Sequence, residues 1–140
     1  MNIVRSLIGK IWQVAVSCGL VRCSNEQAYF ARIASRDIIS DDAFYREYYS
    51  HSNVTLDTCV RIRRVLCEQL RMCNSLPHDN VASIFEDVDI GEVCFEIAEE
   101  FGVKFSEKHI QTTNGTMDSL IRMTQKRIDL ASNSNYPQSE

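Results

Sequence analysis

Apolar residues in this chain recur at helical spacing, and no run alternates between apolar and polar positions as a half-buried strand does. The clearest stripe lies in residues 86–103, and Gly102 follows it where a helix C-cap is expected. This stripe follows the spacing i, i+3, i+4, i+7, i+8, i+11 and consists of Ile90, Val93, Cys94, Ile97, Ala98 and Phe101. With only two prolines and five glycines in 140 residues, the pattern predicts an all-α protein.

The other stripes and turn residues divide the chain into three parts. Residues 1–52 are predicted to be an N-terminal helical extension, 53–130 a helical domain, and 131–140 a disordered tail rich in Ser and Asn. An N-cap is expected at Ser40 and another at either Thr55 or Asp57, and residues 74–84 are predicted to be a long loop. The predicted helices cover about residues 3–15, 27–34, 43–49, 55–73, 86–101, 105–111 and 116–128.

Charge separates the acidic segment from the N-terminal part of the chain. Residues 86–100 contain seven carboxylates and no Lys or Arg, whereas residues 1–36 contain five basic residues and only Glu26 as an acid. An acidic helix face disfavours nucleic acid and favours a basic protein surface. A solvated face without a partner fits the same pattern, and the basic N-terminal part is a rival partner within the chain.

The acidic segment ends in Glu99-Glu100-Phe101-Gly102, a long loop containing Asp79 precedes it, and Thr113-Asn114-Gly115-Thr116 precedes the last helix. This order resembles the acyl and peptidyl carrier proteins. The resemblance covers about residues 55–128 and implies an acyl-carrier-protein-like four-helix bundle, to which the N-terminal helical extension is added.

The resemblance fails at the residue that carries the chemistry of that family. Carrier proteins attach phosphopantetheine to the serine of an Asp-Ser-Leu that opens the acidic helix, and here the aligned residues are Glu86-Asp87-Val88. Asp87 has no hydroxyl with which to attack coenzyme A, although Asp is a good N-cap. Gly91 also departs from the family pattern, and a glycine inside a helix costs about 1 kcal/mol.

The sequence therefore predicts a non-catalytic protein-interaction module without a cofactor. The expected partner is a basic protein surface, and the resemblance implies an enzyme of the fatty-acid or polyketide type. Two alternatives remain: a working carrier with phosphopantetheine on another serine, such as Ser83 or Ser119, and an unrelated helical bundle. The residues predicted to bind the partner are Asp87, Asp89, Glu92, Glu96, Glu99 and Glu100.

No other chemistry is indicated. The six cysteines form no CxxC pair, the three histidines lack ligand spacing, and no phosphate-binding glycine loop occurs, so neither a metal site nor an enzyme is predicted. Reduced, structural thiols in a cytoplasmic protein are expected. The apolar N-terminal run is interrupted by Lys10 and is too short to span a bilayer, and membrane contact by residues 1–20 is not expected.

Overall fold

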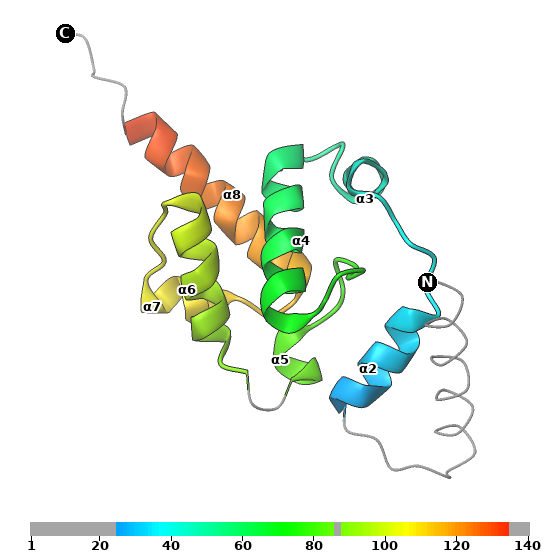
Figure 1. Ribbon diagram of the computed structural model, residues 1–140. Coiled ribbons are helices and arrows are strands. Elements are labelled where there is room, and N and C mark those ends of the chain that lie inside the picture. Colours follow the sequence, from blue (N-terminus) through cyan, green and yellow to red (C-terminus); the bar gives the residue numbers. More distant parts are fainter. Residues whose placement is uncertain (1–24, 86–87, 135–140) are drawn as a thin grey trace, which may run out of the picture.

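The computed structural model describes residues 25–85 and 88–134, and this part of the chain is all-α, as predicted (Figure 1). Its only β pairing is an isolated bridge between Asn80 and Thr116. The helices are α2 (Asn25–Ala34), α3 (Asp41–Tyr48), α4 (Leu56–Leu70), α5 (Val81–Ile84), α6 (Ile90–Phe101), α7 (Glu107–Thr112) and α8 (Met117–Ser134).

The core forms where α4, α6 and α8 meet (Figure 1). Each of these helices contributes side chains that are fully buried: Cys59, Ile62, Leu66, Cys94, Ile97, Leu120 and Ile121. Each large aliphatic side chain buried in this way contributes roughly 1.5–3 kcal/mol. The predicted N-terminal extension is helical where it is described: α3 packs against α4, and α2 packs against α5.

The helix ends at Ser40 and Gly102 are confirmed, and of the two candidates for the start of α4 the structure has Thr55 as the N-cap. The Ser40 side chain accepts a hydrogen bond from the Ala43 N–H, and the Thr55 side chain accepts one from the Thr58 N–H, both at 3.2 Å. Gly102 ends α6 in the left-handed conformation, with φ of 62°. A glycine tolerates this conformation at little cost, which is why it is frequent just after helices.

The start of α6 differs from the prediction. The helix begins at Ile90 with Asp89 as its N-cap, whereas the sequence predicted a start near residue 86 with Asp87 as the cap. The Asp89 carboxylate accepts the Gly91 N–H at 2.7 Å. Gly91 lies in the first turn and not in the helix interior, and an added Cβ there would lie 3.1 Å from Asp89 Oδ1. Asp87 itself lies outside the described residues.

Two further boundaries also differ. The predicted loop 74–84 contains the short helix α5, because Asn80 caps it and Val81 and Ile84 are buried in the core. The last helix continues past residue 128 to Ser134, so the first residues of the predicted 131–140 tail are helical. Residues 135–140 lie outside the described part.

The expectation that all cysteines are reduced is wrong for one pair. Cys67 and Cys73 form a disulfide with a Cα–Cα distance of 4.2 Å. α4 ends at Leu70 and the chain reverses at Arg71, which brings Cys73 back beside the last turn of α4. Cys59 and Cys94 are free and buried, as expected of small apolar side chains.

Candidate functional site

One surface of α6 carries three carboxylates that the fold does not use. Glu92, Glu96 and Glu99 are exposed and share one side of the helix. Within the described residues, none of the three forms an ion pair or accepts a side-chain hydrogen bond. Their charges are therefore available to a partner.

Phe95 lies in the middle of these carboxylates. Its side chain is 61% exposed, although an aromatic ring gains several kcal/mol when it is buried. Glu92 is three residues before Phe95 and Glu99 is four residues after it, so the ring lies beside both acids on one helix surface. We call Glu92, Phe95, Glu96 and Glu99 the α6 face. Phe95 was not among the predicted partner-binding residues; its position off the apolar stripe was the available signal.

The remaining described acids of the predicted partner-binding set act within the chain. Asp89 is the N-cap of α6. Glu100 accepts a hydrogen bond from Arg61 Nε at 2.9 Å and another from the Arg64 guanidinium. The hydrogen bond from Arg61, followed by the charge of Arg64, lowers the pKa of Glu100 despite some desolvation. The Arg61 guanidinium also lies 4.1 Å from the centroid of the Phe101 ring. Glu100 therefore joins α6 to α4.

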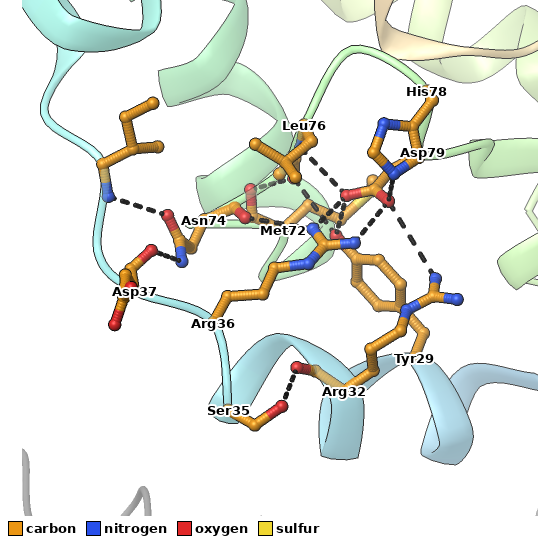
Figure 2. Close-up of polar contacts among 12 residues, drawn as sticks. Tyr29, Arg32, Ser35, Arg36, Asp37, Met72, Asn74, Leu76, His78 and Asp79 are labelled. Carbon is orange, nitrogen blue, oxygen red and sulfur yellow. Dashed lines mark hydrogen bonds and ion pairs between the residues drawn. The ribbon is translucent and has the colours of Figure 1, made fainter.

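A second polar cluster surrounds Asp79, in the loop between α4 and α5 (Figure 2). Arg36 binds the carboxylate with both terminal nitrogens, at 2.5 and 2.8 Å. The Leu76 N–H donates to it at 2.9 Å and the Tyr29 hydroxyl at 3.2 Å. Arg32 lies 3.9 Å away. We call these five residues the Asp79 cluster.

The Asp79 cluster fixes α2 and the segment after it onto the rest of the fold. Asp79 is only 2% exposed, and a buried carboxylate is tolerated when it is paired and hydrogen-bonded. Burial raises its pKa, but the hydrogen bonds from Arg36 and the Leu76 N–H lower it more, so the pKa falls below its ordinary value. Burial raises the pKa of Tyr29 to about 12. Both oxygens of Asp79 accept bonds within the chain, so the group stabilises the fold.

The cluster also bears on the rival partner for the acidic helix. Arg32 and Arg36 are two of the five basic residues in the N-terminal part, and both face Asp79. They do not neutralise the α6 face. The other three, Arg5, Lys10 and Arg22, lie outside the described residues.

The two serines considered for phosphopantetheine differ in exposure. Ser83 is exposed on α5, and its hydroxyl donates to the Asn80 carbonyl at 3.3 Å. Ser119 is half-buried on α8, where its hydroxyl donates to the Thr116 carbonyl at 2.9 Å and lies 2.6 Å from the Thr113 hydroxyl. Neither is at the start of α6, where the carrier family places its serine.

Within residues 25–85 and 88–134, no group of three His, Cys, Asp or Glu side chains could hold a metal ion. In the same part of the chain, no helix has the length and apolar character required to cross a membrane.

An open hollow of about 700 Å³ lies between the α2–α3 connection and Leu76, and its polar lining residues are Ser35, Arg36, Asp37, Ser40 and Glu47.

Comparisons of the chain with protein-family models, with curated proteins and with solved structures found no match in any of the three.

Proposed function

We propose that this protein is a non-catalytic interaction module that binds a basic partner protein through the α6 face. The observation that carries the proposal is Phe95, which is 61% exposed between carboxylates that no described residue neutralises. Partner-binding surfaces favour exposed aromatic residues because an aromatic ring buries much area with little loss of side-chain entropy. Charge around the ring adds specificity and speeds association.

The complementary surface on the partner is an apolar pocket that accepts the Phe95 ring, with Lys or Arg side chains around it. Each exposed ion pair contributes less than about 1 kcal/mol and is screened by salt, so the aromatic contact supplies most of the affinity. Under the carrier-protein resemblance, such a partner is an enzyme of the fatty-acid or polyketide type.

The proposal includes a carrier-protein-like plan for α4, α6, α7 and α8. It is supported by the order of these helices, by Asp79 in the connection between α4 and α6, and by the turn at Gly115 before α8. Asp87 stands where the family has its serine, so the chain is proposed to carry no phosphopantetheine. A cytoplasmic location remains part of the proposal, although the Cys67–Cys73 disulfide is more typical of oxidising compartments.

Binding is tested by immobilising the protein, incubating it with cell extract and quantifying the retained proteins by mass spectrometry. Phe95→Ala, and separately the triple variant E92Q/E96Q/E99Q, should lose at least one retained protein. Leu130→Ala is the matched control for the ring, since Leu130 is 49% exposed on α8. The triple variant D42N/E68Q/E107Q is the control for charge. It also removes three carboxylates, and all three are exposed on helices other than α6. If the variants of the α6 face retain every protein that the controls retain, the proposed interface is wrong.

The proposal that the protein carries no phosphopantetheine is tested by incubating it with coenzyme A and a broad-specificity phosphopantetheinyl transferase. The wild type should show no gain in mass. Modification of Asp87→Ser alone would support a carrier-like surface, and it should be partial because α6 begins three residues later, at Ile90. Modification of the wild type, with the site mapped to Ser83 or Ser119, would instead identify a working carrier.

A further inference from the structure

The Cys67–Cys73 disulfide closes the turn that follows α4. Arg71, between the two cysteines, has a φ of 58°, and such a left-handed conformation costs roughly 1–2 kcal/mol for a residue other than glycine. Two backbone hydrogen bonds support the turn: the Arg71 N–H donates to the Cys67 carbonyl, and the Met72 N–H donates to the Leu66 carbonyl. The disulfide is a covalent addition to a turn whose backbone conformation is unfavourable by itself.

The loop that begins at this turn supplies the polar groups that hold the N-terminal segment. Asn74, directly after Cys73, donates through its side chain to the Asp37 carbonyl at 3.0 Å and accepts the Ile39 N–H at 3.3 Å. Its carbonyl also accepts from Arg36 at 3.3 Å. The hydroxyl of the next residue, Ser75, lies 3.3 Å from the Tyr29 hydroxyl. Asp79 follows in the same loop and faces Tyr29 (Figure 2).

The N-terminal helix α2 has little other support. Among the described helices it packs mainly against α5, which has four residues. One aromatic contact reinforces this side, between Phe30 and Phe85, with ring centroids 6.1 Å apart. The docking of α2 therefore depends on the α4–α5 loop (residues 71–80) keeping its conformation.

The disulfide is accessible, whereas the free thiols in the described part of the chain are not. Cys73 is exposed and Cys67 is half-buried. Cys59 and Cys94 are fully buried, and burial raises their pKa to about 12 and about 11, so both remain protonated near neutral pH. An external dithiol therefore meets one reactive sulfur site in this region, at Cys73.

We infer that the Cys67–Cys73 disulfide is a redox-sensitive latch that controls the docking of α2. A dithiol thiolate attacks Cys73 Sγ, the S–S bond breaks, and Cys67 leaves as a thiolate that takes up a proton. The other thiol of the same dithiol molecule then attacks the dithiol sulfur of the mixed disulfide and releases Cys73 as a thiol. The protein disulfide gains two electrons and two protons, and the dithiol becomes a cyclic disulfide. The freed α4–α5 loop loses its fixed conformation, and α2 separates from α5 more often. This inference is independent of the α6 face.

Hydrogen exchange of the full chain, with and without dithiothreitol, tests the latch. Reduction should speed exchange of the α2 amides about tenfold and leave the α8 amides unchanged. The double variant C67S/C73S should exchange like the reduced protein and should not respond to dithiothreitol. Alkylation and peptide mapping confirm which cysteines were reduced.

Two results would overturn the inference: unchanged α2 exchange after Cys67 and Cys73 have been reduced, or equal acceleration of α2 and α8, which would indicate general destabilisation. The same hydrogen-exchange experiment is repeated on the C18S/C23S variant, which removes the two cysteines that lie outside the described residues. The response of α2 should persist in that variant, and its loss would assign the redox effect to other thiols.

Discussion

The Asp79 cluster and the α6 face use the same functional group in opposite ways. The side chain of Asp79 has no exposed surface and is bound by Arg36 and by a backbone N–H, whereas Glu92, Glu96 and Glu99 are open to solvent without a described partner. Removing a partner from a buried charge is costly, while exposed charges can be changed with little effect on stability. The comparison separates carboxylates that the fold needs from those that are free to bind another molecule.

The largest effect is expected from breaking the buried ion pair. Arg36→Met removes both guanidinium hydrogen bonds to Asp79 and leaves the buried carboxylate with only the more distant Arg32, at 3.9 Å, as an arginine partner in the cluster. The free energy of unfolding should fall by about 3 kcal/mol, as measured by urea denaturation. Lys126→Met, at an exposed position on α8, is the control and should change it by less than about 0.5 kcal/mol. An equally small change in Arg36→Met would show that the Asp79 cluster is not needed for stability.

Acid should remove the contribution of the Asp79 carboxylate to the free energy of unfolding. The pKa of Asp79 in the folded protein lies below its ordinary value, so the unfolded chain binds this proton more readily. The resulting stabilisation is fully present above the unfolded pKa of about 3.9 and is lost as the pH falls toward the folded pKa. In urea denaturation, the difference in the free energy of unfolding between the wild type and Asp79→Asn should shrink as the pH falls below about 4. A difference that grows below that pH would contradict the depressed pKa of Asp79.

A smaller loss is expected at the start of α6. Asp89→Ala removes the acceptor of the Gly91 N–H and should lower the free energy of unfolding by about 1 kcal/mol. Glu99→Ala, on the α6 face, is the matched control and should leave stability nearly unchanged. Thermal denaturation followed by circular dichroism is sufficient to compare the two. Equal losses would remove the distinction between a structural acid and an available acid on the same helix.

The smallest effect on stability is expected from the α6 face itself. E92Q/E96Q/E99Q should change the free energy of unfolding by less than about 0.5 kcal/mol, because the three carboxylates have no described partner and repel one another at i,i+3 and i,i+4 spacing. The same variant should lose partner binding. A loss of stability above 1 kcal/mol in urea denaturation would show that these acids support the fold.

The sequence predicted most of what depends on local pattern. The all-α class, the caps at Ser40, Thr55 and Gly102, and the apolar stripe of α6 are all present. The start of the acidic helix was misplaced because the carrier-protein resemblance puts Asp87 at the head of the helix, whereas the apolar stripe begins only at Ile90; Asp87 and Asp89 are both good caps. The choice depends on the bond from the Gly91 N–H to the Asp89 carboxylate.

Features that depend on distant residues could not be predicted. Asp79 was singled out in the sequence, but its partner Arg36 lies 43 residues earlier and has no recognisable spacing to it. The disulfide requires the chain to reverse at Arg71, and an arginine gives no signal of a left-handed turn. Phe95 was overlooked because periodicity draws attention to the apolar stripe, and it lies on the other side of the helix.

The long separation between α2 and its docking loop also has a consequence for the order of folding during synthesis. Tyr29 and Asp79 are 50 residues apart, and the Tyr29 contact cannot form until the loop has been made. At about 5–20 residues per second, α2 leaves the ribosome roughly 3–10 s before the residue that anchors it. Local contacts form within microseconds, so α2 is complete before the loop that binds Tyr29 has been synthesised. In the growing chain, α2 is therefore the first described element made, and its docking loop is complete before α6 and α8 are synthesised.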